Sequence, residues 1–262
     1  MLPRLHLFEI HEQKWCPNCI RSGVTDGLYT AWKVMFWQNA MPHIRDLIAH
    51  AEEPHIVDLC SGSGGPLPLV IEALAQEDQR VRCTLTDLFP NSDWSSSNPQ
   101  LQYWQNPVDA REVPATIGKA RTLFEAFHHF RPVDAQKILA DAVRNKQPIA
   151  IFEFQRRSLV DAILPPISLV VLVASFFNFW HTPFRWSKLI FTLIPIIPFI
   201  LLFDGIVSVL RTYNSEELAK MATEAGTDGY RWEVRQTKDR GMKRITCLIG
   251  WPCQQGGLEI RN

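Results

Sequence analysis

Between residues 55 and 154, short apolar segments alternate with segments of helical periodicity. The segments with strand character are 55–60, 81–88, a short stretch within 101–110, 120–130 and 148–154, and the helical segments are 67–76 and 132–145. This alternation predicts a mostly parallel sheet with helices on both faces, joined by right-handed crossovers. Ligands of such sheets bind at the carboxyl ends of the strands, so we expect the functional residues there.

Helical and strand patterns also precede and follow this region. Residues 1–50 have a helical pattern, because apolar residues recur every three or four positions in 26–51. Residues 215–226 begin with a serine and two acids and end at a glycine, as a capped helix does. The segments YRWEVRQT and KRITCLIGW indicate two closing strands.

Composition excludes several classes of protein. The 262 residues contain 27 basic and 27 acidic side chains, so we expect no nucleic-acid partner. Six cysteines are too few for a disulfide scaffold. Cys16 and Cys19 form a CxxC pair, but no second pair follows at zinc spacing, so we predict no metal site. The first residues include acids and lack a long apolar core, unlike a secretory signal, so we expect the globular part to be cytoplasmic.

Two long segments without charge interrupt the soluble pattern: 163–180 (ILPPISLVVLVASFFNFW) and 189–203 (LIFTLIPIIPFILLF). Such runs are unusual in soluble helices, so they predict a membrane-associated hairpin, although each is short for a full span of about 20 residues. Trp180 and Trp186 flank the connection, as aromatic residues do at a membrane interface. Three alternatives stay open: a hairpin that enters one leaflet, a buried helical pair and a dimer interface.

These patterns divide the chain into parts. We expect residues 1–50 to form an N-terminal helical cap, residues 51–160 and 211–262 to form the α/β domain, and residues 161–210 to be the inserted apolar hairpin. The hairpin follows the fifth strand, close to the ligand edge of the sheet. A site at that edge would open toward the bilayer and admit a lipophilic ligand.

The segment IVDLCSGSGGP (56–66) ends an apolar run in an acid and then breaks into glycine, which lets the backbone approach a ligand closely. A dinucleotide-binding turn needs the spacing GxGxxG, whereas this turn has Gly62, Gly64 and Gly65 before Pro66. Asp58 precedes the glycines. Its negative charge would repel phosphates but attract a ligand that carries an amino group and a sulfonium cation.

IVDLCSGSG resembles the first motif of class I S-adenosylmethionine-dependent methyltransferases, in which a strand-end acid is followed by GxGxG. Cys60 stands where that motif has its first glycine, and the later two glycines are kept. The segments VRCTLTDL, NPVDAREVP, FEAFHHF and PIAIFEF resemble the family's later motifs in the same order. The resemblance covers 50–160 and 211–252 and implies an α/β fold with a doubly wound, mostly parallel seven-stranded sheet, which is Rossmann-like.

The resemblance also implies S-adenosyl-L-methionine as the cofactor. Asp87 would accept hydrogen bonds from the two ribose hydroxyls, and Asp109 one from the adenine amino group. Taken singly, Asp87 suits the start of a turn and Asp109 suits a helix cap, but their positions at successive strand ends favour a ligand. The predicted cofactor-binding residues are Asp58, Cys60, Ser61, Gly62, Gly64, Asp87, Leu88, Asp109, Ala110 and Phe127.

Methyl transfer from a sulfonium is an in-line displacement, for which the protein must hold the acceptor near the methyl group and exclude water. A hydroxyl or protonated amine acceptor also benefits from a base. We predict that base among His128, His129 and Glu153; the alternative for the histidines is a structural turn. From position alone, the predicted acceptor contacts are Tyr29, Trp32, Arg156 and Tyr213.

The sequence therefore predicts a membrane-associated S-adenosylmethionine-dependent methyltransferase that acts on an oxygen or nitrogen of a small or lipophilic acceptor. The alternative is a cofactor-binding protein without catalysis, anchored at a membrane as a partner or regulator. Cys60 in place of a motif glycine favours this alternative slightly.

Overall fold

The computed structural model describes residues 2–31, 33, 37–92, 94–174, 180, 182, 184–237 and 245–253. The chain divides into two compact units. Unit 1 comprises Met1–Phe36, Gln155–Asn214 and Arg240–Lys243, and unit 2 comprises Trp37–Phe154, Ser215–Asp239 and Arg244–Asn262.

The expected N-terminal cap at 1–50 is divided between the units. Its second helix, α2 (Trp37–Ala49), belongs to unit 2 because it buries one apolar face against the sheet and α3 (Leu67–Gln76). The buried residues of that face are Ala40, Met41, Ile44 and Leu47.

Unit 2 is built on a seven-stranded sheet in the order β3-β2-β1-β4-β5-β7-β6. The strands are β1 (His55–Asp58), β2 (Arg82–Leu85), β3 (Leu101–Tyr103), β4 (Ala120–Phe124), β5 (Ile149–Glu153), β6 (Tyr230–Gln236) and β7 (Thr246–Pro252). Strands β1 to β5 are parallel, whereas β7 runs antiparallel between β5 and β6. The predicted mostly parallel sheet is confirmed.

The strand order reverses between β1 and β4. Asp58 at the end of β1 lies opposite Leu85 of β2 on one side and opposite Thr122 of β4 on the other. The carboxyl ends of these strands therefore lie side by side, at the point where doubly wound sheets bind their ligands. Every residue of β4 and β5 is buried, which explains why these segments are not alternating in hydropathy.

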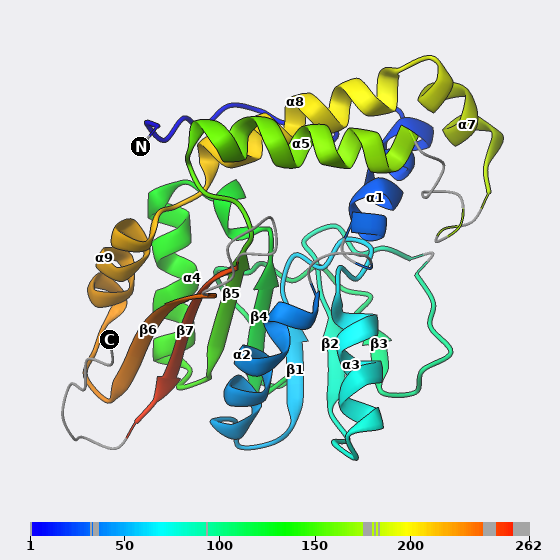
Figure 1. Cartoon of the computed structure of the whole chain (residues 1–262). Coiled ribbons are helices and arrows are strands. Elements are labelled where there is room, and N and C mark those ends of the chain that lie inside the picture. The colour runs from blue at the N-terminus through cyan, green and yellow to red at the C-terminus, as the bar shows by residue number, and fades with distance from the viewer. Residues whose placement is uncertain are drawn as a thin grey trace. The chain divides into compact units, whose positions relative to one another are not determined.

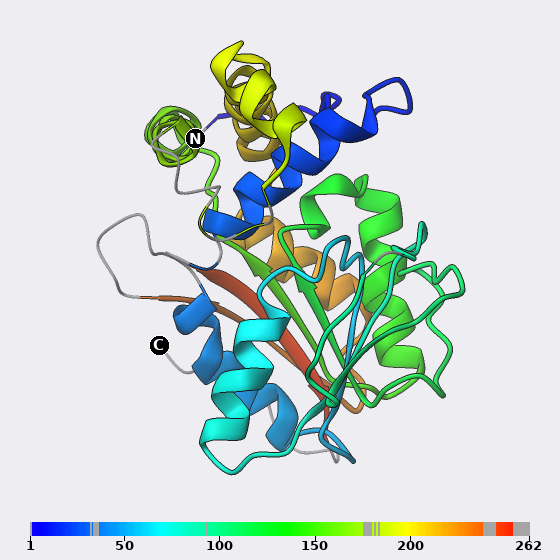
Figure 2. The same ribbon diagram turned by 90° about the vertical axis from the view of Figure 1, so that its right-hand side faces the viewer.

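Helices α2 and α3 cover one face of the sheet, and α4 (Pro132–Arg144) and α9 (Ser215–Ala225) cover the other (Figure 1 and Figure 2). Proline stands in the first turn of both α3 and α4, where a missing N–H leaves no helical hydrogen bond unmade. Asp134 in the first turn of α4 and Arg144 in its last turn complement the helix dipole. These local signals explain why both helices begin where the sequence predicts.

A buried ion pair lies at the amino-terminal end of the sheet. Arg121 of β4 is 0% exposed and donates to Asp141 Oδ2 of α4 at 2.6 Å and to Gln147 Oε1 at 2.8 Å. Burial lowers the pKa of Arg121, and the hydrogen bond that Arg121 donates to Asp141 opposes that shift. Asp141 also accepts the backbone N–H of Val113 at 3.2 Å, so the pair joins β4, α4 and the preceding loop.

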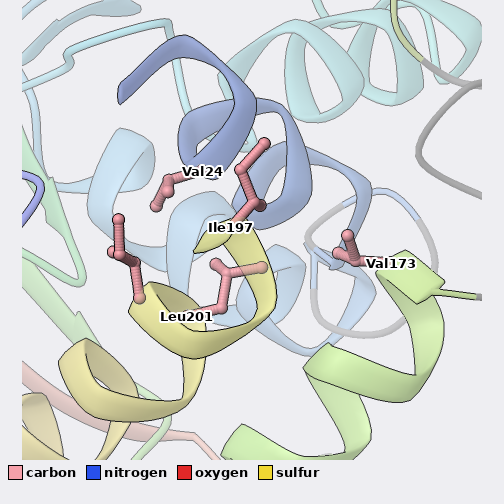
Figure 3. Close-up of a cluster of buried hydrophobic side chains, with 5 residues drawn as sticks. Val24, Val173, Ile197 and Leu201 are labelled. Carbon is pink, nitrogen blue, oxygen red and sulfur yellow. The ribbon is translucent and has the colours of Figure 1, made fainter. Parts of the chain in front are cut away.

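Unit 1 contains the helices α1 (Asn18–Ala31), α5 (Leu159–Ala174), α7 (Trp186–Leu193) and α8 (Ile196–Arg211). Figure 3 shows part of its core, where Val24 of α1 and Val173 of α5 lie close to Ile197 and Leu201 of α8. Gly27 of α1 permits this close packing, because a Cβ there would lie 3.1 Å from Val173 Cγ2 and 3.3 Å from Leu201 Cδ1.

The second apolar segment, expected as one arm of a hairpin, is divided at Pro195 into α7 and α8, with a bend of 74°. Ile194 is extended because a residue before proline avoids the helical region, and Pro195 offers no N–H. The first segment is helical in α5 up to Ala174, and residues 175–179 lie outside the described residues. In the described part of the chain no one helix has both the length and the apolar character to cross a membrane, while the bent pair α7–α8 has them jointly.

Candidate active site

The turn after β1 has the left-handed backbone that glycine allows. Gly62, Gly64 and Gly65 have φ of +52°, +99° and +48°. Cys60 also has a positive φ, +58°, which costs a residue with a side chain about 1–2 kcal/mol. Cys60, which stands where the resembled motif has its first glycine, thus has the left-handed backbone that glycine would adopt. Burial and the nearby Asp87 raise the pKa of the Cys60 thiol, so the thiol stays protonated and is a poor nucleophile.

Asp58 lies beneath this turn, with 2% of the residue exposed. Its Oδ1 accepts the hydroxyl of Thr122 at 2.6 Å, and its Oδ2 accepts that of Ser61 at 2.7 Å. Burial raises the pKa of Asp58 to about 7, and the two hydroxyl hydrogen bonds limit the rise. The carboxyl group therefore changes its charge near neutral pH, directly under the turn.

This raised pKa predicts a specific pH dependence of stability. The folded state holds the Asp58 proton more tightly than the unfolded state, whose carboxyl has a pKa near 3.8. The stability that this group contributes is present below pH 3.8 and is lost as the pH rises through about 7. The loss amounts to about 1.4 kcal/mol per pH unit in that window, or up to about 4 kcal/mol in all.

Asp58→Asn keeps an acceptor for the hydroxyls but cannot ionise. Urea unfolding from pH 4 to pH 8 should therefore show wild type losing more stability than Asp58→Asn, with the difference growing toward pH 7. The other ionisable groups are the same in both proteins, so their contributions cancel in the difference between the two free energies of unfolding. Parallel curves for the two proteins would contradict the raised pKa.

Asp87 follows β2 and is joined to the glycine turn. Its Oδ2 accepts the backbone N–H of Gly62 at 3.0 Å, and its Oδ1 accepts that of Phe89 at 2.9 Å. The backbone carbonyl of Asp87 accepts the N–H of Val108 at 2.9 Å. The structure therefore brings the segments after β1, β2 and β3 together, as the sequence predicts. Leu88, next to Asp87, is 46% exposed at this edge.

Asp109 is held by its neighbour Arg111. The Arg111 side chain donates Nε to Asp109 Oδ1 at 2.9 Å and Nη2 to Oδ2 at 2.7 Å, and the Arg111 backbone N–H also reaches Oδ1. These hydrogen bonds lower the pKa of Asp109, so it is ionised at neutral pH. Both oxygens already accept strong donors, which weakens the predicted side-chain contact with an adenine amino group. Ala110 is 4% exposed.

Two aromatic residues at the turn were not predicted from the sequence. Trp94 Nε1 donates to the Ser63 carbonyl at 3.2 Å, and the Tyr103 hydroxyl donates to the Gly62 carbonyl at 3.1 Å. The two rings lie 5.7 Å apart. A tryptophan within the polar loop NSDWSSSNPQ is the sequence signal that could have identified this contact.

His128 and Glu153 form a buried dyad at the same end of the sheet. His128 lies in the 3₁₀ helix η2 (Phe127–His129) after β4, and Glu153 ends β5. Glu153 Oε2 lies 2.8 Å from His128 Nδ1, and Glu153 Oε1 accepts the His128 backbone N–H at 3.0 Å. A carboxylate only accepts, so Nδ1 carries the proton and the basic lone pair is at Nε2. The His129 ring lies 4.2 Å from that of His128.

Glu125 completes a group of possible metal ligands in unit 2. One ligand atom each from Glu125, His128 and Glu153 lies within 4.8 Å of the others, and Glu125 Oε1 also accepts the Phe154 backbone N–H. Nitrogen and carboxylate oxygen ligands suit several divalent cations. The sequence predicted no metal site, because no second pair follows Cys16 and Cys19 at zinc spacing. Glu125 and His128 follow β4 and Glu153 ends β5, so no short spacing marks this group.

No protein-family model matches the sequence, and no curated protein matches it. Solved structures do match. Human N-acetylserotonin methyltransferase in complex with S-adenosylmethionine aligns with a TM-score of 0.53 at 10% identity, over 90% of this chain and 56% of that chain. An O-methyltransferase of neocarzinostatin biosynthesis, in complex with S-adenosylmethionine and 2-hydroxy-5-methyl naphthoic acid, aligns with a TM-score of 0.51 at 13% identity, over 90% and 58%. The chain shares the fold of these two proteins.

This likeness confirms the fold that the sequence motifs imply. The chain spans little more than half the length of the two matched chains. Methyltransferase folds of such low identity share an architecture, while the activity depends on the residues of each site.

Five predicted site residues remain, namely Phe127 and the four predicted acceptor contacts. Phe127 precedes His128 in η2 and is 0% exposed, and its predicted contact with a cofactor stays a prediction. Tyr29, Arg156 and Tyr213 belong to unit 1. Tyr213 is 4% exposed, with the guanidinium of Arg4 3.9 Å from its ring centre. Trp32 lies outside the described residues. The predicted acceptor contacts of these four stay predictions.

Proposed function

We propose that the protein is an S-adenosylmethionine-dependent methyltransferase whose cofactor binds across the turn at residues 60–65. The observation that carries this proposal is the Asp87 carboxylate, held 3.0 Å from the Gly62 N–H beside the reversal point of the sheet. A carboxylate at this place suits two adjacent ribose hydroxyls. Both matched methyltransferases carry S-adenosylmethionine in their structures, which supports the same cofactor here.

The charges near the turn favour a cationic ligand. Asp87 lies beside the turn, and Asp58, which becomes negative as the pH rises through about 7, lies under it, so a pyrophosphate would meet like charge there. Since Arg111 holds the Asp109 carboxylate, we assign the adenine side to Leu88 and the backbone of Asp109 and Ala110.

His128 is the proposed general base, and Glu153 is its positioning residue. Bound S-adenosylmethionine would supply the methyl group and would keep the electron pair of its carbon–sulfur bond as the leaving sulfide. His128 Nε2 would accept the proton of the attacking oxygen or nitrogen. Glu153 holds the tautomer and stabilises the imidazolium that forms. The matched methyltransferases are named for, or solved with, aromatic acceptors, so we propose a small or lipophilic acceptor with a hydroxyl or amine.

Association with a membrane is the second part of the proposal. The support is the distribution of exposed apolar side chains: in the described part of the chain, all the large ones except Leu88, Phe89, Trp104 and Val133 belong to unit 1. A soluble unit of this size rarely exposes so much apolar surface. A membrane-associated enzyme would meet a lipophilic acceptor at the bilayer.

Calorimetry with Asp87→Asn tests the proposed cofactor site. Wild type should bind S-adenosylmethionine and its demethylated product, and Asp87→Asn should bind about 10–100-fold more weakly, because hydrogen bonds to a charged acceptor are lost. Asp78→Asn is the matched control, since Asp78 is exposed and follows α3. Saturation of wild type by NAD with no heat from S-adenosylmethionine would refute the proposal, and so would an unchanged affinity of Asp87→Asn.

A further inference from the structure

Helix α5 is apolar on the side that it turns away from the core of unit 1. Val160, Ile163, Leu164, Ile167 and Val171 stand at i, i+3, i+4, i+7 and i+11 and are each between 45% and 61% exposed. We refer to these five as the α5 stripe. Side chains at this spacing lie along one face of a helix. The other face of α5 packs inside the unit, where Val173 is 0% exposed.

Several charged groups of unit 1 are buried and paired with one another. Asp204 of α8 accepts the backbone N–H of Ile10 at 2.7 Å and contacts His11 Nδ1 at 2.7 Å. Arg211 Nη1 lies 3.1 Å from Glu9 Oε1, and both residues are less than 5% exposed.

A second buried pair joins α1 and α7. Lys188 is 0% exposed, and its Nζ lies 3.1 Å from Asp26 Oδ2 and 2.6 Å from the hydroxyl of Thr182. Unit 1 therefore holds paired charges beside its apolar core and carries aliphatic side chains on the outer side of α5. Proteins in lipid have this arrangement, with ionisable groups facing one another in the interior.

We propose that the α5 stripe lies in one leaflet of a lipid bilayer, with the axis of α5 close to the plane of the membrane. The proposal rests on the membrane association proposed above and specifies its surface and depth. The 16 residues of α5 extend about 24 Å, less than the roughly 30 Å of a hydrocarbon core, and only one side of the helix is exposed. An interfacial helix buries such a side in the boundary between headgroups and acyl chains.

Lipid suits the stripe better than a protein partner, because the stripe has no charged or hydrogen-bonding side chain to select one. Exposed aromatic rings follow α5: Trp180 is 78% exposed, Phe184 is 54% exposed, and Trp186, the first residue of α7, is 71% exposed. Tryptophan prefers the interface between headgroups and acyl chains, since its ring is apolar and its N–H can reach water.

Vesicle flotation of the full-length protein tests the proposal. Wild type should float with phosphatidylcholine vesicles, and the double variant Ile163→Gln/Ile167→Gln should partition at least about tenfold less, because two buried aliphatic side chains are lost from the lipid contact. Val133→Gln is the matched control, since Val133 is an aliphatic residue that is 68% exposed on α4 of unit 2. The Val133→Gln protein should partition into vesicles as wild type does.

Tryptophan quenching by brominated lipids tests the depth. Lipids brominated near the headgroup should quench vesicle-bound wild type more strongly than lipids brominated near the chain ends. Stronger quenching from the chain ends would overturn the single-leaflet position. Binding only to vesicles that contain phosphatidylserine would overturn the apolar contact. If wild type is a dimer in solution and the double variant is a monomer, the stripe contacts a second copy of this chain instead of lipid.

Calorimetry with S-adenosylmethionine on the same samples separates the two proposals. Cofactor binding without flotation overturns the lipid contact and leaves the methyltransferase proposal standing. Flotation without cofactor binding overturns the methyltransferase proposal and leaves the lipid contact standing. An unchanged cofactor affinity of the double variant also shows that its loss of flotation is not a loss of folding.

Discussion

Replacing His128 by asparagine is expected to lower kcat for methyl transfer by about 10²–10⁴-fold, the range that a positioned general base contributes. The asparagine amide keeps a donor near Glu153 but has no basic nitrogen at the position of Nε2. Affinity for S-adenosylmethionine should stay near that of wild type, because His128 belongs to the acceptor side of the proposed site. Initial rates with radiolabelled S-adenosylmethionine, lipophilic phenols and hydroxynaphthoic acids measure the effect.

His129→Asn is the matched control for this experiment. The two histidines are neighbours, but only His128 has its Nδ1 at 2.8 Å from Glu153, so His129→Asn should retain most of kcat. Glu153→Gln should lower kcat, since the carboxylate orients the His128 ring and stabilises the imidazolium that forms. Full activity of His128→Asn would remove the dyad from the mechanism, and a large loss in His129→Asn would transfer the role to its neighbour.

Breaking the buried pair of Arg121 and Asp141 is expected to cost unit 2 about 3–5 kcal/mol, because one charge is left in the core without its partner. Asp141→Asn removes the carboxylate 2.6 Å from Arg121 Nη1 and also weakens the acceptor for the Val113 N–H. Urea unfolding followed by circular dichroism measures the loss.

The double variant Arg121→Met/Asp141→Leu is the informative comparison. Both charges are then absent, so the double variant should be much more stable than Asp141→Asn. The pair lies at the amino-terminal end of the sheet, so cofactor affinity at the carboxyl end should not change in any folded variant. Equal stability of wild type and Asp141→Asn would mean that the pair contributes nothing to folding.

Most of unit 2 could be predicted from the sequence, because its signals are local. Continuous apolar segments indicate strands buried on both faces, Pro132 and Asp134 mark the start of α4, and the acid and glycines after β1 mark the turn. Parallel strands bring their carboxyl ends to one edge, so the proximity of Asp87 to Gly62 followed from topology. The fold is thus predictable from periodicity together with the order of elements.

The contacts that could not be predicted depend on geometry that periodicity does not encode. Which of the two histidines pairs with Glu153 depends on the 3₁₀ turn of η2, which directs His128 to it. The engagement of Asp109 by Arg111 depends on a loop conformation. The grouping of residues 1–36 with 155–214 joins segments more than a hundred residues apart, and nothing in either segment specifies that partner.

The position of β7 between β5 and β6 has a consequence for biosynthesis. β5 has its neighbour on one side only, and β6 has none, until residues 246–252 have left the ribosome. During translation, the helices of unit 1 are made while that half of the sheet still presents open backbone edges. Closure of this half of the sheet therefore follows the synthesis of unit 1, and the nascent chain depends on protection from edge-to-edge association until β7 has paired with β5 and β6.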